Sequence, residues 1–476
     1  MGTRVLRARD PENEDLRKGV AEIQQEQRLP QGFPPEVEKA AAKAAQTPRL
    51  PDLDLTHLEL VTIDPAGAMD LDQAMHLAAD GDGYVVHYAI ADVMAFVRPG
   101  DPVDLEAHRR GESFYAADCK IPLHPPALSE GAASLLPDQE RPAFVWTVRL
   151  DATGVVTDAQ VERARVRSRE RLDYETVQAT VDDAPTGSTL ALLREVGELR
   201  IAQEVKRGGI SLPMPSQEID IEDGRWRLEY REMLPSESWN AQISLMTGFA
   251  AAAIMIEGKV GLLRTLPPAP EFVVTRLRRT ARALGLDWPS DLGHADFIRA
   301  LDAARPAEAA MVVAATALLR GAGYAAFDGE LPDQVEHAAL ASPYAHVTAP
   351  LRRLVDRYAL EVCAALCAGE PVPDWARDGL AALPQIMRDS GRAANAYEGA
   401  VMNLVEAETL RDRVGESFDA VVTEVESDDP HKGEVMLRDP AVEARVTSER
   451  PLPVGEEVRV RLTVADPKTR MVRFEL

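Results

Sequence analysis

The spacing of apolar residues changes twice along this 476-residue chain, and these changes limit the folds that the chain can adopt. Between residues 58 and 166, apolar and polar residues alternate, as in YVVHYAI at 84–90, and this pattern predicts strands. Between 190 and 411, apolar residues recur at three- and four-residue intervals, which predicts helices. After residue 415 the alternation returns. This order predicts an α+β protein with more than one domain.

Individual elements can be predicted within these regions. The segment RPAFVWTVRLDATGVV at 141–156 predicts a strand, a turn that contains glycine, and a returning strand. Helical spacing is clearest at 190–206, 238–257, 309–320, 352–367 and 380–411. The alternating segments after residue 415 are SFDAVVTEV, EVMLRD, EARVT, EEVRVRLTVA and MVRFEL. Five short strands joined by turns fit a small closed β-barrel of the oligonucleotide-binding (OB) kind.

The first 50 residues differ in composition from the rest of the chain. They are rich in Glu, Lys, Gln and Ala, and PQGFPP at 30–35 interrupts them, so we expect two short helices separated by a turn. A chain of this length is too long for one core. We therefore expect a small helical domain at 1–50, with the order of a helix-turn-helix, a mixed α+β domain at 51–413, and the OB barrel at 414–476.

Charge and apolar content exclude some classes of protein. The net charge of −25 argues against a protein that coats nucleic acid with its outer surface, although an internal basic channel stays compatible with it. No segment approaches the roughly 20 apolar residues that a bilayer requires, and the N-terminal residues are charged. We expect a cytoplasmic protein with no membrane partner. Cys363 and Cys367, one helical turn apart, are expected to be buried free thiols.

The most informative segment is IDPAGAMDLDQA at 63–74. Asp70 and Asp72 are two residues apart, so in an extended chain their carboxylates project to the same side. A proline and a glycine between Asp64 and Asp70 allow a turn that returns Asp64 to the same point. Converging carboxylates repel unless a cation neutralises them, and oxygen ligands suit magnesium or manganese. An isolated Asp-x-Asp is more often a solvated turn, so the other motifs decide between the two interpretations.

Further motifs follow in order and resemble the ribonuclease II/ribonuclease R (RNB domain) family. In that family, Ile-Asp-Pro opens a cluster of four aspartates, to which IDPAGAMDLDQA is similar. The later similar segments are VHYAIADVMAFVRPGDPVDLEAHRRGESFYAAD, IPLHPPALSEGAASLLPDQERPA, RSRERLDYETV and YAHVTAPLRRLVDRY. Together they span about 61–408. The resemblance implies a central RNB catalytic domain and a magnesium-dependent 3′→5′ exoribonuclease, with manganese as the other possible metal. It also implies that single-stranded RNA is hydrolysed to nucleoside 5′-monophosphates by a monomer.

The resemblance also implies roles for the acidic residues. Asp64, Asp70 and Asp72 are expected to bind metal, and Asp70 and Asp72 to be catalytic, with Asp72 at the position that is indispensable for cleavage. Gln73 stands at the fourth metal position, where the family has an aspartate, so one ligand is neutral. Many relatives have glutamate at the position of Asn240.

Five other residues are implied to bind RNA. Tyr115 and Tyr174 match tyrosines that contact the last nucleotides. Arg352 matches the catalytic arginine that grips the scissile phosphate, a role that suits a planar guanidinium with two donors. Arg353 beside it is a weaker candidate. Glu398 matches a glutamate near the 3′ ribose, where a carboxylate favours RNA over DNA by accepting from hydroxyl groups.

Two other functions stay open at this point. Gln73 is compatible with a catalytically weak or inactive RNA-binding relative, which would bind RNA with magnesium and never shorten it. A metal-dependent phosphohydrolase acting on small phosphate esters would leave the C-terminal barrel without a role. Three acids and the arginine are retained, and this favours the exoribonuclease. The chain before residue 61 is too short for the paired cold-shock barrels common in the family, and the predicted helices stand in their place.

Overall fold

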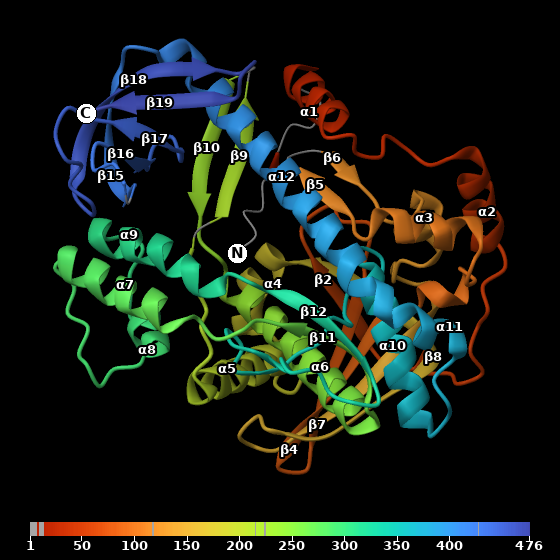
Figure 1. Cartoon of the computed structure of the whole chain (residues 1–476). Helices are drawn as coiled ribbons and strands as arrows, with labels where there is room; N and C mark the ends of the chain where they lie inside the picture. Colours follow the sequence, from red (N-terminus) through yellow and green to blue (C-terminus); the bar gives the residue numbers. More distant parts are fainter. Residues whose placement is uncertain (1–6, 9–13, 117–118, 215, 223–224, 427) are drawn as a thin grey trace.

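The computed structural model describes residues 7–8, 14–116, 119–214, 216–222, 225–426 and 428–476. Strands dominate the first part of the central region and helices the second, and a closed barrel follows at the C-terminal end, as the periodicity predicts (Figure 1). The α+β class and the C-terminal barrel are therefore confirmed. The division at residues 50 and 413 stays a prediction.

A closed barrel of five strands forms the first half of the central region, in the order β2-β3-β4-β7-β8. Its strands are β2 (Leu60–Asp64), β3 (Gln73–Asp80), β4 (Gly83–Ala91), β7 (Glu140–Leu150) and β8 (Val156–Asp173). The predicted hairpin at 141–156 is the β7–β8 pair, and Gly154 in its turn has a φ of 77°. β2 and β8 run parallel, so their last residues, Asp64 and Asp173, lie side by side.

The chain leaves the barrel between β4 and β7 and returns to it. This excursion contains a 3-10 helix (Val93–Ala95), α3 (Pro102–Arg110), the hairpin β5 (Phe114–Ala116) and β6 (Cys119–Ile121), and a π-helix (Leu128–Ala132). α3 begins where the carboxylate of Asp101 accepts from the backbone N–H of Asp104, which is the usual aspartate cap. The hairpin carries Tyr115 toward the end of β2.

The predicted helices of the second half are all present. They are α5 (Thr189–Arg207), α6 (Pro235–Gly258), α9 (Pro306–Ala315) with a 3-10 turn (Thr316–Leu319), α10 (Leu354–Ala368) and α12 (Leu383–Leu410). Shorter elements complete this half: α4 (Tyr174–Thr180), α7 (Glu271–Ala283), α8 (His294–Arg299), α11 (Asp374–Gly379), β11 (Val260–Thr265), β12 (Gly323–Asp328), β13 (Glu336–His337) and β14 (Ser342–Pro343).

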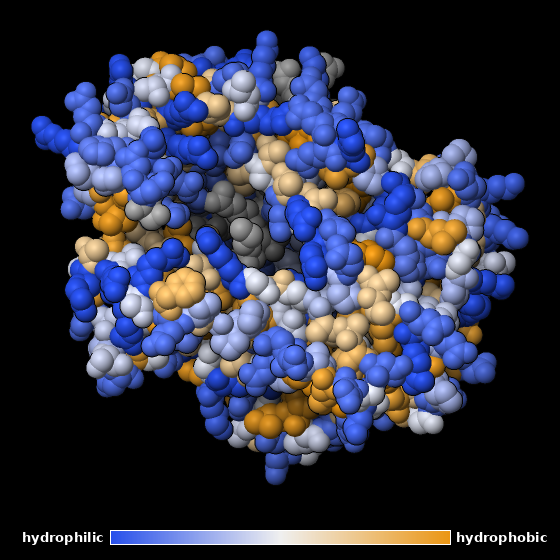
Figure 2. All heavy atoms as spheres, viewed as in Figure 1, coloured by the Kyte–Doolittle hydropathy of each residue, from blue (hydrophilic) through white to orange (hydrophobic). Residues whose placement is uncertain are grey.

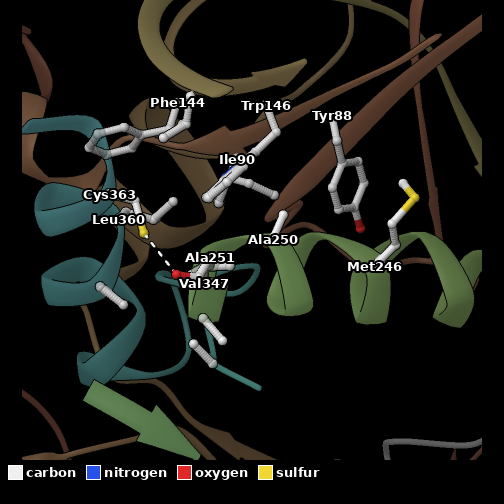
Figure 3. Packing of buried hydrophobic residues seen from close by; sticks show 14 of the residues in the cluster. Tyr88, Ile90, Phe144, Trp146, Met246, Ala250, Ala251, Val347, Leu360 and Cys363 are labelled. Carbon is white, nitrogen blue, oxygen red and sulfur yellow. Dashed lines mark hydrogen bonds between the residues drawn. The ribbon is translucent and has the colours of Figure 1, made fainter. Parts of the chain in front are cut away.

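The largest core lies between the first barrel and helices α6 and α10 (Figure 3). Tyr88 and Trp146 from the barrel face α6, and each large apolar side chain buried there contributes about 1.5–3 kcal/mol. The thiol of Cys363 donates to the carbonyl of Ala251 across the two helices, at 3.7 Å. The prediction of buried thiols is right for Cys363 and wrong for Cys367, which is exposed because it lies beyond the packed face of α10.

Helix α6 is long and apolar enough to cross a membrane by length and composition alone, contrary to the expectation that no segment would be. In the structure it packs against α5, α10 and β11, and its buried residues belong to the central core. The apolar character of α6 is therefore accounted for by its packing inside the protein.

The two short helices expected before residue 50 are present as α1 (Glu14–Glu26) and α2 (Pro35–Ala45), whereas their assignment to a separate helix-turn-helix domain stays a prediction. They pack on different parts of the molecule, α1 against α12 and α2 against α3. A short strand, β1 (Arg7–Ala8), adds to the pair β9 (Ser216–Glu222) and β10 (Arg225–Arg231).

The C-terminal barrel contains the five predicted strands in the order β15-β16-β17-β19-β18. They are β15 (Ser417–Val425), β16 (Lys432–Leu437), β17 (Glu443–Thr447), β18 (Glu457–Asp466) and β19 (Met471–Glu475). Phe418 and Phe474 are buried in its core with ring centroids 5.8 Å apart, so they pack against each other and not against a base. Figure 2 shows a mostly hydrophilic face that is hollowed between this barrel and α12.

Candidate functional site

The loop between β2 and β3 carries the aspartates, and a neighbouring segment holds its shape. The Ser134 hydroxyl accepts from the backbone N–H of Leu71 at 3.0 Å and donates to the carbonyl of Met69 at 2.6 Å. The N–H of Leu135 donates to the carbonyl of Leu71 at 3.0 Å. These bonds fix the backbone on both sides of Asp70, so the direction in which the loop presents its carboxylates is set by the fold.

Asp72 is the most buried of the three acids, with 3% of its surface exposed. One carboxylate oxygen accepts from the N–H of Leu351 at 2.8 Å, and the other lies 3.5 Å from Nε of Arg352. Burial raises the pKa of Asp72 to about 8, and the positive charge of Arg352 opposes that rise. A cation bound here would offset the cost of ionising this carboxyl.

Asp64 is the last residue of β2, where the loop that carries Asp70 and Asp72 begins. Burial raises the pKa of Asp64 to about 7; Arg352 lowers it and Asp70 raises it further. Its Oδ2 is buried and has no hydrogen-bond partner among the described residues. An unpartnered buried carboxylate oxygen beside a second carboxyl is a donor set that suits a divalent cation.

Asp70 has a partner that its sequence neighbourhood does not reveal. Its Oδ2 lies 3.0 Å from Nζ of Lys120, and Lys120 also lies 2.8 Å from Glu130. The Tyr115 hydroxyl donates to the same oxygen of Asp70 at 3.4 Å. Lys120 comes fifty positions later in the chain and reaches the site because it pairs with Tyr115 in the β5–β6 hairpin. That hairpin register is the signal that could have identified it.

Asp70 is close enough to Asp64 and to Asp72 to raise the pKa of each, but the three aspartates do not form a ligand set. Over the described residues, no three His, Cys, Asp or Glu side chains are grouped so that they could hold a metal ion. Asp70 is engaged by Lys120, and the side-chain amide of Gln73 donates to the carbonyl of Thr348. Asp64 and Asp72 are therefore the residues that would hold a cation, and Gln73 links β3 to the segment before Arg352.

Arg352 and Arg353 are adjacent but differ in environment. The Arg352 side chain is 44% exposed and available to a ligand beside Asp72. The Arg353 guanidinium makes two 2.8 Å hydrogen bonds to Asp356, whose carboxylate also accepts from the N–H of Ala349 at 2.7 Å. Arg353 thus stabilises the turn that presents Arg352, and no observation tests the RNA contact predicted for it.

The two tyrosines lie near different aspartates, Tyr115 near Asp70 and Tyr174 near Asp64. Tyr115 is 45% exposed and its hydroxyl faces Asp70. Tyr174 begins α4, and its hydroxyl accepts from the Asn240 side chain at 3.1 Å. Burial, with the negative charge of Asp64, raises the pKa of Tyr174 to about 12, so the hydroxyl stays protonated and can donate to a phosphate or sugar oxygen. Asn240, recognised in the sequence as a departure, therefore orients Tyr174.

Glu398 lies on α12 and is half-buried. The hydroxyl of its neighbour Tyr397 accepts from Gln24 of α1 at 2.8 Å, which fixes this turn of the helix against the N-terminal segment. The position of Glu398 at the 3′ ribose stays a prediction.

The acidic pair predicts a dependence of stability on pH. The pKa values of Asp64 and Asp72 are raised to about 7 and about 8, whereas an unfolded aspartate titrates near pH 3.9. The folded protein therefore binds more protons, and the stability that these two groups contribute is complete below about pH 3.9 and lost as pH rises to about 8. In EDTA, we expect Tm to fall between pH 5 and pH 8, and Asp72→Asn to show a smaller fall. An equal fall of Tm in the parent protein and in Asp72→Asn would contradict the raised pKa assigned to Asp72.

Lys120 predicts an effect on metal affinity. Replacing it with methionine removes the ammonium from Asp70 and leaves that carboxylate available, so we expect Mn²⁺ to bind roughly tenfold more tightly, as titration calorimetry would measure. Lys432→Met is the matched control, because Lys432 lies 2.8 Å from Asp429 in the C-terminal barrel. Unchanged affinity in Lys120→Met would show that the ammonium does not compete with the metal.

Comparison with known proteins finds two family models that match this chain. The RNB domain model matches residues 53–367, and the RNase II-type exonuclease C-terminal S1 domain model matches residues 416–476. The exosome complex exonuclease RRP44 homolog A of Arabidopsis thaliana is 30% identical over 332 residues, covering 66% of this chain and 35% of that protein. Ribonuclease R of Vibrio cholerae is 28% identical over 435 residues, covering 84% and 52%. The chain thus spans less than two thirds of either relative.

Two solved structures share the fold. Mycoplasma genitalium RNase R in complex with ribose methylated single-stranded RNA superposes with a TM-score of 0.86 at 19% identity, over 98% of this chain and 78% of that one. Yeast Ssd1, a pseudonuclease, has a TM-score of 0.72 at 16% identity, over 97% and 58%. The likeness to these structures concerns the fold alone, and it includes proteins with and without nuclease activity.

Proposed function

The chain belongs to the RNB domain family of ribonuclease II-type exonucleases, and from this membership we propose that it shortens single-stranded RNA from the 3′ end and releases nucleoside 5′-monophosphates. The observation that carries the proposal is that the exposed guanidinium of Arg352 lies beside the buried carboxyl of Asp72 and acts by its charge on the half-buried Asp64. Metal-assisted hydrolysis of a phosphodiester uses a site for a cation and a donor for the phosphate oxygens.

Each residue of the site has a task in this reaction. Arg352 binds the non-bridging oxygens of the terminal phosphodiester and stabilises the charge that grows on them. Asp64 and Asp72 would hold Mg²⁺ or Mn²⁺, which, when bound, lowers the pKa of a coordinated water and offsets charge on the phosphate. Tyr115 and Tyr174 border the acids, and their hydroxyls position the last nucleotides by donating to phosphate or sugar oxygens.

A labelled oligonucleotide tests the proposal. With Mg²⁺, a 5′-labelled oligo(A) should give a ladder of products shortened one nucleotide at a time, together with AMP. A circular RNA of the same sequence should stay intact because it has no 3′ end. A phosphohydrolase acting on small esters would instead hydrolyse mononucleotide esters with no dependence on chain length. Cleavage of the circle, or turnover of the esters alone, would overturn the proposal.

A second candidate is a relative that binds RNA without cutting it. Two observations favour it: Gln73 in place of the fourth acid, with its amide already bonded to Thr348, and a structural neighbour described as a pseudonuclease. It predicts that oligo(A) binds in the presence of Mg²⁺ or Mn²⁺ and is never shortened. The ladder assay separates the two candidates, provided that binding is measured in the same preparation.

A further inference from the structure

Arginine occupies every second position of β8 between residues 163 and 171. The row consists of Arg163, Arg165, Arg167, Arg169 and Arg171. Alternate residues of a regular strand project to the same side and are spaced by roughly 6.6 Å, which applies to Arg163, Arg165 and Arg167. The pairing of β8 with β2 shifts in register between Ser168 and Glu170, so Arg169 and Arg171 lie at and after an irregularity of the strand. Such a series is unexpected on a chain with a net charge of −25, and its position decides what it can bind.

The charges of the row are neutralised unequally. At its start, Arg163 pairs with Asp92 and Glu361, so this arginine links β8 to α10 and serves the fold. Arg165 lies 3.2 Å from Asp54, and Arg167 lies 2.7 Å from Glu140. The side chains of both ion pairs, Arg165 with Asp54 and Arg167 with Glu140, are partly exposed to solvent. Ion pairs of this kind are weak, so a ligand can replace the carboxylate in each.

The last two arginines have different partners. Arg169 donates to the carbonyl of Thr56 at 2.8 Å, and Arg171 donates to the carbonyl of Ala68 at 3.3 Å. Both side chains are exposed, and among the described residues neither has an ion pair with a carboxylate. The positive charge of the row is therefore least neutralised at its C-terminal end.

That end of the row lies at the aspartate loop. In the parallel pairing of β2 with β8, Arg171 is opposite Thr62, two positions before Asp173, which is opposite Asp64. Arg171 also contacts the sulfur of Met69, at 3.2 Å, one residue before Asp70. The C-terminal end of the row thus lies at the loop that carries the acids.

We propose that this arginine row binds the backbone of single-stranded RNA upstream of the 3′ end and guides it to the aspartate loop. The proposal rests on the proposed function, because the substrate at the end of the row is taken to be RNA. Several guanidinium groups along one strand suit a polymer with a phosphate in every unit, because each phosphate can accept two hydrogen bonds from one arginine. Recognition of this kind is independent of base sequence and sensitive to salt.

The test uses Arg169→Gln/Arg171→Gln, made in an Asp72→Asn background so that bound RNA is not degraded. Binding of a labelled oligo(A) of about ten nucleotides is measured at several salt concentrations. Loss of two phosphate contacts is expected to reduce the slope of log K against log salt by about 1.4, since each contact to a single strand contributes about 0.7. The matched control is Arg149→Gln/Arg194→Gln, which removes two exposed arginines from β7 and α5.

A trinucleotide separates backbone binding from a change in the site. In the otherwise wild-type protein, the row variant should shorten the decamer more slowly, and the loss of rate with a trinucleotide should be smaller, because a trinucleotide reaches only the end of the row at the aspartate loop. The proposal for the arginine row would be overturned by an unchanged salt slope, by an equal reduction of the slope in the control variant, or by an equal loss of hydrolysis rate with the trinucleotide. The exoribonuclease proposal would stay intact in each case. Failure of the parent protein to bind RNA would overturn both.

Discussion

Asp72→Asn is expected to slow the hydrolysis of RNA by on the order of a hundredfold to a thousandfold and to leave the protein folded. The asparagine oxygen can still accept from the N–H of Leu351, but the neutral amide cannot hold a cation as a carboxylate does. Because ionising this buried carboxyl is unfavourable, its removal should also raise Tm at pH 8 in EDTA. Loss of activity together with a higher Tm would show that the effect is chemical and not a failure to fold.

The matched control is Asp80→Asn. Asp80 is the last residue of β3, the strand that begins directly after Asp72. Its carboxylate is exposed and paired with Arg149. The substitution removes the same charge about eight residues from Asp72 and should leave the rate of hydrolysis within about twofold of the parent, because an exposed ion pair contributes little. Equal losses in the two variants, or full activity in Asp72→Asn, would reject the assigned centre.

Arg352→Lys is expected to lower kcat by on the order of a hundredfold. Lysine keeps the positive charge beside Asp72, but it cannot supply two parallel donors to a phosphate group. Since the missing donor matters most when charge grows on the phosphate oxygens, kcat and kcat/KM should fall together while KM changes little. Single-turnover rates with a 5′-labelled RNA measure this change without interference from product release.

Arg377→Lys is the control for this variant. Arg377 lies on α11, is similarly exposed and is weakly paired with Asp328, at 3.6 Å. It should hydrolyse RNA at the parent rate. A rise in KM with kcat unchanged in Arg352→Lys would mean that Arg352 binds the ground state of the substrate and does not stabilise the transition state.

Much of the fold could be predicted from the sequence because it depends on local spacing. Alternation of period two identified the β7–β8 hairpin and the five strands of the C-terminal barrel, and three- and four-residue spacing identified α5, α6 and α10. A buried strand or helix needs its apolar residues on one side, so these periods are imposed by the core itself.

The details of the site were less predictable because they depend on contacts between distant segments. Lys120 reaches Asp70 through a hairpin, and Asn240 reaches Tyr174 from α6. The residue spacing within 63–74 predicted that the acids converge, but it contained no information on a lysine that neutralises Asp70. In the sequence, Arg353 is a weaker candidate for binding RNA beside Arg352. In the structure, its guanidinium is bound by the carboxylate of Asp356, one helical turn away.

The hydrogen bond from Leu351 to Asp72 joins residues that are 279 positions apart. The backbone amide and the guanidinium beside this carboxylate come from consecutive residues, Leu351 and Arg352, in a turn held by Asp356. The two groups beside Asp72 therefore enter the chain together, and truncation before residue 351 would remove both while leaving all three aspartates in the polypeptide.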